Sequence, residues 1–313
     1  MALAAARRGA HLGRYRWAVT ETTLLTHTDL DGIGCAVIFA GAAPDPGPIQ
    51  LVENGAIDQR VREAVGARMA DADRHQVLVT DHGVDAATAD AADAFVAAGG
   101  RFALLDHHRS SEHLAGRRWA TIDGGRSATG LLFDHLGRPA AFAEFARLVE
   151  DHDLWRHQDP RSARLATLAA LIGADRFLAR FSADPRVDLR EEERLLVDAE
   201  EARRRDYLRR KLEQARVAEI DGARWAICYA EQYQSDLAEH LMSELEVAAT
   251  AIVNPGKRTV SLRGRGVDVS AVARRYGGGG HARAAAFSFA ASSLEADLAG
   301  FERALDAALA RTI

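Results

Sequence analysis

The sequence predicts an α/β fold, in which a parallel-sheet N-terminal domain is joined by a helical linker to a smaller α/β C-terminal domain. Three observations carry this prediction. Short apolar or β-branched runs alternate with alanine-rich helical patterns over residues 1–180, a long charged helical pattern follows, and the alternation then resumes. Strands that alternate with helices form βαβ units, whose parallel sheets are covered on both faces. A length of 313 residues also favours two domains.

The N-terminal domain is expected over residues 1–187. Strands are expected at residues 17–25, 49–53, 76–80 and 101–105. Helices are expected between them, at residues 34–42, 58–70 and 86–98. Ligands of such sheets bind beyond the carboxyl ends of the strands, so the residues that directly follow each strand are the first place to look for a site.

Residues 188–219 form a charge-laced helical pattern and are expected to be a solvated helical linker. The C-terminal domain is expected over residues 220–313. Its strands are expected at residues 224–229, 247–253, 258–263 and 284–289. Its helices are expected at residues 234–245, near residues 268–273, and from Leu294 to the end.

The charge distribution favours a small anionic substrate. The formal net charge is −5, whereas a long nucleic acid bound along the surface requires a basic stripe. Aspartate and histidine are concentrated in the first half, and an arginine-rich stretch lies between Arg258 and Arg283. A small anionic substrate held between an acidic, metal-loaded site and a local basic pocket fits this distribution.

The composition indicates a cytoplasmic protein with no membrane contact. No apolar run reaches the roughly 18 residues that a membrane span needs, and the N-terminus has no continuous apolar stretch typical of a signal peptide. Cys35 and Cys228 lie far apart, so they indicate neither a disulfide framework nor a zinc site.

Acidic and histidine residues gather in four short clusters. Three clusters directly follow predicted strands, and the fourth ends a helical pattern over residues 141–150. The clusters lie at residues 26–32, 81–83, 106–108 and 151–155. Because parallel strands end at one edge of a sheet, we expect the first three clusters to meet. So many carboxylates repel one another unless cations neutralise them, and two divalent ions about 3.5–4 Å apart also clamp an in-line displacement at phosphorus.

Each cluster has a structural alternative when taken alone. An Asp-x-Asp-Gly segment such as Asp29 to Gly32 is most often a turn whose acids cap backbone groups. Asp81 after a strand is typical of a helix N-cap, and paired histidines often have structural roles. The recurrence of all the clusters at the strand ends of one predicted sheet favours a metal site of imidazole and carboxylate, which suits manganese.

These motifs resemble the DHH family of phosphoesterases, named for the tripeptide that is Asp106-His107-His108 here. The first family motif resembles residues 27–32, the second Asp81, and the fourth Asp151 with the following Asp153. A glycine-rich segment at residues 277–285 resembles the signature of the C-terminal substrate domain associated with this family. The N-terminal domain would then be the DHH catalytic domain.

The resemblance implies two Mn²⁺ ions, with Mg²⁺ or Co²⁺ as alternatives, and a bridging role for Asp81. The first ion would be held by His27, Asp29 and Asp81. The second ion would be held by Asp31, Asp81, His107 and Asp151. Asp151 is favoured for this role, and Asp153 is the alternative. His108 would face the substrate phosphate as a catalytic residue, and Asp106 would orient a neighbouring imidazole.

The C-terminal glycine run is interpreted as part of the substrate site, although a flexible turn is the common alternative. Glycine lets a backbone approach phosphate closely, and arginine offers a bidentate fork to its oxygens. By the resemblance, the substrate-binding residues are Arg263, His281, Arg283, Gly279 and Gly280. Trp155, after the fourth motif, is interpreted as a packing residue, with base stacking as the alternative.

The sequence therefore predicts a metal-dependent phosphodiesterase that hydrolyses short oligonucleotides or dinucleotides to mononucleotides, by attack of a metal-activated water. A cyclic-dinucleotide or adenosine-bisphosphate phosphohydrolase is the alternative. A single-strand exonuclease, a pyrophosphatase and a catalytically silent nucleotide-binding protein rank below these. The preference between RNA and DNA, and the existence of a homodimer, are left open.

Overall fold

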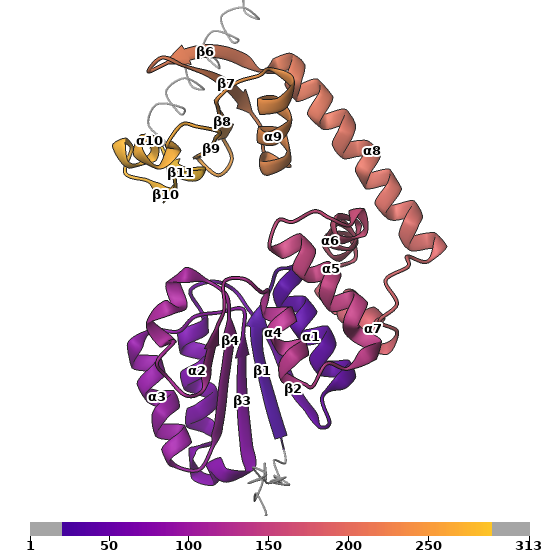
Figure 1. Cartoon of the computed structure of the whole chain (residues 1–313), viewed down its shortest axis with the longest axis vertical. Helices are drawn as coiled ribbons and strands as arrows, with labels where there is room; N and C mark the ends of the chain where they lie inside the picture. Colours follow the sequence, from indigo (N-terminus) through magenta and orange to yellow (C-terminus); the bar gives the residue numbers. More distant parts are fainter. Residues whose placement is uncertain (1–20, 290–313) are drawn as a thin grey trace, which may run out of the picture. The chain divides into compact units, whose positions relative to one another are not determined.

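A computed structural model describes residues 21–289, and the chain divides into two compact units at residues 1–197 and 198–313. The helices and strands of the two units are labelled in Figure 1. None of the helices within residues 21–289 combines the length and apolar character needed to cross a lipid bilayer.

The first unit is built on a five-stranded sheet with the order β2-β1-β3-β4-β5, in which every neighbouring pair is parallel. The strands are β1 (Glu21–His27), β2 (Pro46–Val52), β3 (His75–Thr80), β4 (Arg101–Asp106) and β5 (Ala120–Ile122). The central parts of the inner strands β1, β3 and β4 are buried on both faces because helices cover both sides of the sheet. Their carboxyl ends therefore reach one edge of the sheet together.

Two groups of helices cover the sheet (Figure 1). One face carries α2 (Ile57–Ala67) and α3 (Ala86–Ala97), and the other carries α1 (Leu30–Ala42) and α4 (Ala128–His135). Three more helices follow along the chain, α5 (Ala143–Asp153), α6 (Pro160–Ile172) and α7 (Ala174–Ala183). The unit also contains three short 3₁₀ helices, η1 (Met69–Arg74), η2 (Arg109–Leu114) and η3 (Ala140–Phe142). Buried apolar side chains of α5, α6 and α7 form one core cluster with α1.

Three phenylalanines hold α5 against α7. The rings of Phe145, Phe177 and Phe181 are fully buried, and the Phe145 centroid lies 5.3 Å from that of Phe181 and 6.2 Å from that of Phe177. Such aromatic pairs contribute about 0.5–1.5 kcal/mol beyond the area that they bury. Because α5 ends in the fourth acidic cluster, this packing fixes the position of Asp151 and Asp153.

The second unit contains a mixed six-stranded sheet with the order β10-β11-β9-β8-β7-β6. Only β7 and β8 pair in parallel. The strands are β6 (Arg216–Ile220), β7 (Ala223–Tyr229), β8 (Ala249–Asn254), β9 (Thr259–Gly264), β10 (Gly279–His281) and β11 (Ala284–Ser288). The helices α9 (Gln234–Glu244) and α10 (Val269–Arg275) accompany this sheet, and α8 (Glu191–Gln214) precedes it.

The predicted fold class is confirmed, and most boundaries differ from the expectations by a few residues. The helix expected at 58–70 ends at Ala67 and continues as η1 after a break. The strand β6 was not expected, because it is an exposed edge strand with the same charged composition as the helix before it. Residues 17–20 of the first expected strand and the helix from Leu294 lie outside the described residues.

Replacement of Phe145 by alanine should destabilise the first unit by about 3–5 kcal/mol, because it leaves a cavity between α5 and α7. Urea unfolding followed by circular dichroism measures this change. Val96→Ala on the outer surface of α3 is the control, since Val96 is 40% exposed and surface changes stay within about 0.5 kcal/mol. Equal midpoints for the two variants would contradict this account of the packing.

Candidate metal centre

The carboxyl ends of β1, β3 and β4 bring the first three clusters together, as the sequence predicted. Thr26 on β1 lies beside Thr80 on β3, and Thr80 lies beside Leu105 on β4. The next residues along the strands are His27, Asp81 and Asp106. Three groups of side chains in the described part of the chain have the spacing of metal ligands, and all three lie at this edge.

One group contains His27, Asp29 and Asp81. The Nδ1 atom of His27 lies 3.0 Å from Asp29 Oδ2 and 3.7 Å from Asp81 Oδ2. Asp29 is also the N-cap of α1, because its Oδ1 accepts hydrogen bonds from the amides of Asp31 and Gly32, both at 3.1 Å. The capping alternative thus accounts for one oxygen of Asp29, and the other oxygen faces His27.

A second group contains Asp31, His107 and Asp153. The Nε2 atom of His107 lies 3.8 Å from Asp31 Oδ2 and 3.6 Å from Asp153 Oδ2. Asp31 is held by the N-terminus of α4, since its carboxylate accepts hydrogen bonds from the amides of Ala128 at 2.7 Å and Thr129 at 2.9 Å. A helix N-terminus stabilises a carboxylate in this way.

Asp81 lies between the two groups. Its Oδ2 faces His27, and its Oδ1 lies 3.4 Å from His107 Nε2. Asp81 is 2% exposed and has a φ of 58°, a left-handed conformation that is rare outside glycine. It caps no helix, because Asp85 is the N-cap of α3. Backbone strain of this kind occurs at functional sites, where the surrounding structure maintains it.

The carboxylates at this edge interact unfavourably when all are ionised. Burial, together with the negative charges of Asp31 and Asp29, raises the pKa of Asp81 to about 11. Burial and the same two neighbours raise the pKa of Asp153 to about 7. Divalent cations between the groups would remove this penalty.

Two carboxylate oxygens at this edge lack hydrogen-bond partners, which also fits a pair of bound metal ions. The Oδ2 atoms of Asp81 and Asp153 are buried, and neither accepts a hydrogen bond. A buried carboxylate oxygen without a partner is costly, so these two atoms are where a bound cation is expected. Imidazole nitrogens and carboxylate oxygens are ligands of manganese and of related divalent ions.

The prediction that Asp151 joins the cluster needs correction. Its carboxylate accepts hydrogen bonds from the amides of Gln158 at 2.9 Å and Asp159 at 3.3 Å, and from Ser162 Oγ at 2.6 Å. Asp153, the alternative to Asp151, reaches His107 instead. Residues two apart on a helix point about 200° apart, so α5 can present only one of the two to the site.

Asp106 orients His108, the second histidine of the Asp-His-His tripeptide. Its Nδ1 donates a hydrogen bond of 2.8 Å to Asp106 Oδ1, and Ser111 Oγ donates to Asp106 Oδ2. The hydrogen bond to Asp106 raises the pKa of His108. The side chain of His108 is half exposed, so the imidazole stands at the rim with a fixed orientation.

Several supporting groups were missed from the sequence. The amides of Ala128 and Thr129 come from a helix start about 97 residues after Asp31, and no local pattern links the two. Ser111 lies in η2, where a serine has many ordinary roles. His82 makes a T-shaped ring contact with His27, with centroids 4.9 Å apart, and its place in the second cluster is a signal that the sequence does carry.

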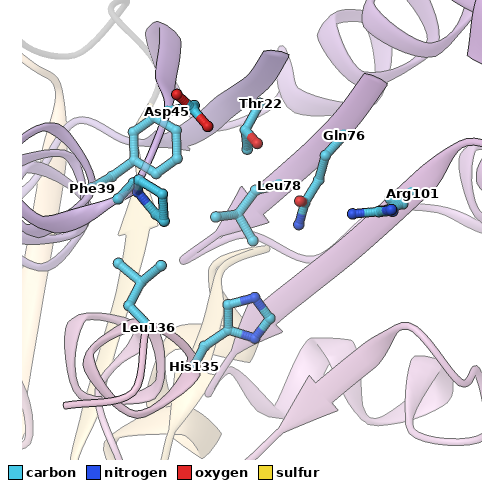
Figure 2. Close-up of a pocket in the computed structure, with 10 residues that line it drawn as sticks. Thr22, Phe39, Asp45, Gln76, Leu78, Arg101, His135 and Leu136 are labelled. Carbon is cyan, nitrogen blue, oxygen red and sulfur yellow. The ribbon is translucent and has the colours of Figure 1, made fainter. Parts of the chain in front are cut away.

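A cavity of about 350 Å³ opens beside this edge and is lined by Asp81 and His108, together with residues at the start of α2. No lysine or arginine lines it. At the opposite edge of the sheet, the amino ends of the strands border a cavity of about 190 Å³ lined by Thr22, Gln76 and Arg101, among others (Figure 2). None of the predicted site residues lines that second cavity.

The predicted substrate residues of the second unit lie at one end of its sheet. His281 on β10 pairs with Ala284 on β11, which pairs with Arg263 on β9. Residues directly opposite in antiparallel strands share a face, so His281 and Arg263 stand on the same side, two strand spacings or roughly 10 Å apart. Arg283 is exposed in the connecting turn.

The glycine run has a structural reason of its own. A Cβ at Gly280 would lie 2.5 Å from the carbonyl oxygen of Ala284, and the φ of Gly280 is 136°. Gly280 therefore allows β10 to pair closely with β11. Gly279 is exposed, and a Cβ there would meet no other atom within 4 Å, so its backbone is open to a ligand.

Comparisons with known proteins connect this geometry to a family. The chain is 31% identical over 287 residues to oligoribonuclease NrnB of Bacillus subtilis (strain 168), an alignment that covers 85% of this chain and 72% of the relative. Residues 231–311 match the DHHA1 domain family.

Solved structures show the same fold at low identity. The pGpG-specific phosphodiesterase PggH of Vibrio cholerae is similar with a TM-score of 0.56 and 14% identity, over 91% of this chain and 99% of that protein. The exonuclease RecJ bound to manganese is similar with a TM-score of 0.51 and 15% identity, over 90% and 89% respectively. With the Asp-His-His tripeptide and the acidic clusters at one sheet edge, these findings show that the chain belongs to the DHH family of phosphoesterases.

Proposed function

We propose that this chain is a manganese-dependent phosphodiesterase that hydrolyses short oligonucleotides or dinucleotides to mononucleotides. The observation that carries the proposal is the position of Asp81, whose two oxygens face two separate groups of imidazole and carboxylate ligands. The relative NrnB, whose name describes an oligoribonuclease, supports the substrate class. We keep as part of this proposal a catalytic domain at residues 1–187, a linker at 188–219 and a substrate-binding domain at 220–313.

Two Mn²⁺ ions would be held by the groups that Asp81 joins. The first ion would take His27, Asp29 and Asp81 as ligands. The second ion would take Asp31, Asp81, His107 and Asp153 as ligands, with Asp153 in place of Asp151. Bound there, the ions would lower the pKa of an attacking water and neutralise charge on the phosphoryl oxygens.

The protein side chains supply orientation and charge. His108, fixed by Asp106, would donate a hydrogen bond to a phosphoryl oxygen of the substrate, and its raised pKa favours the charged donor. Arg263 and His281, which share one face of the second sheet, would bind a terminal phosphate of the short substrate. Arg283 and the open backbone of Gly279 would assist this binding.

A panel of substrates tests the proposed function. With Mn²⁺, the protein should release mononucleotides from linear dinucleotides and from a five-nucleotide RNA, and a chelator should abolish this release. A DNA equivalent, cyclic dinucleotides, adenosine bisphosphate and pyrophosphate complete the panel, with products separated by chromatography. Turnover confined to pyrophosphate, or to the bisphosphate, would replace the proposal by that activity.

Asp81→Asn should lower the Mn²⁺-dependent rate by at least about 10³-fold, because the group that joins the two ions is lost. Without metal the same change should raise the melting temperature. The folded-state pKa of Asp81 is about 11, so at neutral pH the metal-free protein must take up a proton at Asp81 to fold, and asparagine removes that cost. Added Mn²⁺ should stabilise the unmodified protein more than the variant.

Asp85→Asn is the matched control for Asp81→Asn, since Asp85 caps α3 outside the cluster and asparagine is an equally good cap. It should leave activity and Mn²⁺ stabilisation unchanged. Full activity of Asp81→Asn would rule out the bridging role.

Asp153→Asn should weaken Mn²⁺ binding by roughly 10- to 100-fold or more. Loss of a residue that only orients a metal ligand already costs this much, and Asp153 would be a ligand itself. Asp151→Asn should instead lower the melting temperature, because Asp151 accepts three hydrogen bonds at the end of α5. Calorimetric titration with Mn²⁺ and thermal unfolding separate the two effects. If Asp151→Asn weakened Mn²⁺ binding and Asp153→Asn left it unchanged, Asp151 would be the ligand of the second ion.

A further inference from the structure

The turn that follows α5 presents an aromatic ring to solvent. The side chain of Trp155 is 59% exposed, so our interpretation of it as a packing residue was wrong. Both Trp155 and His157 have positive φ values, of 55° and 48°, and strained backbone of this kind persists only where the surrounding structure maintains it. An exposed indole on a strained turn therefore calls for an explanation other than packing.

Hydrogen bonds and ring contacts hold this turn in one conformation. The amide of Trp155 donates to His152 O at 3.0 Å, and the amide of Arg156 donates to Asp151 O at 3.0 Å. The imidazole of His157 packs edge-on against the indole, with the ring centroids 4.5 Å apart. The Trp155 indole is thus supported by a neighbouring ring while most of the residue stays accessible, which suits a preorganised stacking surface.

The turn lies next to the candidate metal centre. Trp155 is two residues beyond Asp153, whose Oδ2 lies 3.6 Å from His107 Nε2. The guanidinium of Arg156 donates to Glu150 Oε1 at 3.1 Å and to Gly125 O at 3.0 Å. The loop that contains Gly125 is joined to the end of β4, since the amide of Asp123 donates to Asp106 O at 3.0 Å.

The chemistry of this surface favours an uncharged planar group. The neighbouring cation, Arg156, is already engaged by Glu150 and by a carbonyl oxygen, so the turn offers an aromatic face in place of a free positive charge. A phosphate gains little from an indole, whereas every nucleobase has a π-face that stacks on one. The cavity beside the centre, which Asp81 and His108 help to line, also has no lysine or arginine in its lining.

We propose that Trp155 stacks on a nucleobase adjacent to the scissile phosphate and thereby selects nucleotides over phosphodiesters without bases. The proposal rests on the proposed function and identifies what the same site recognises beyond the phosphate. Stacking on one side of the phosphate would position the substrate against Asp153 and the other ligands of the centre.

The test compares a linear dinucleotide with an abasic analogue that keeps both sugars and the phosphodiester. Trp155→Ala should raise KM for the dinucleotide by roughly 5- to 100-fold with little change in kcat, and should leave the kinetics of the abasic analogue unchanged. Trp155→Phe, which keeps an aromatic face, should recover most of the loss. Val96→Ala, exposed on α3, is the surface control.

Binding provides a readout that does not depend on turnover. Titration of the dinucleotide into the full chain with Ca²⁺ should quench tryptophan fluorescence, and Trp155→Phe should remove most of the quenching. Equal KM and equal quenching in the unmodified protein and the Trp155 variants would overturn the stacking role, as would an equal loss on the abasic analogue. Quenching that needs Trp155 without any dinucleotide hydrolysis would overturn the proposed function but keep the stacking site.

Discussion

Mutual repulsion among buried carboxylates is the constraint on which the rest of this protein depends. Asp31, Asp81 and Asp153 converge at the edge where three parallel strands end, and burial together with neighbouring negative charge raises the pKa of Asp81 to about 11. A fold that packs acids so closely is stable in its ionised form only with cations between them. The backbone strain at Asp81 adds to this cost, so the centre is organised for binding at the expense of the metal-free state.

Helix N-termini reduce part of that repulsion. Asp29 caps α1 through one oxygen, and Asp31 accepts two amide hydrogen bonds from the start of α4. Both contacts stabilise the charged form of a carboxylate through partial positive charge on backbone amides. A glycine is required where α1 starts, because a Cβ at Gly32 would lie 2.2 Å from the carbonyl oxygen of His27. The Asp-x-Asp-Gly motif therefore combines a helix start with two acids that belong to the centre, Asp29 exposed and Asp31 buried.

The surroundings of the centre differ from the centre itself in charge. The ligands are acids and imidazoles, whereas the cavity beside Asp81 and the turn at Trp155 offer no free arginine or lysine. Basic residues suited to phosphate lie in the second unit, where Arg263 and His281 share one face of the sheet. Within the first unit, an aromatic surface and a cavity without basic side chains suit a nucleotide better than a compact polyanion such as pyrophosphate.

The sequence by itself determined the fold class, the strand-end positions of the clusters, and the ligand types. These follow from local information, since hydrophobic periodicity places strands and helices, and parallel strands must end at a common edge. The second unit was also visible in this way, except for its two edge strands. The strand β6 has little apolar contrast with the helix before it, and β10 is a three-residue strand within the glycine run.

Only the tertiary structure decided which neighbouring residues face the site. Asp151 and Asp153 are chemically identical, and the rotational position of α5, set by Phe145 and its partners in α7, turns one toward His107 and the other toward Ser162. The amides that hold Asp31 come from about 97 residues away. The exposure of Trp155 likewise depends on a turn fixed by contacts with another loop. Such features depend on how distant segments pack, and no local pattern contains that information.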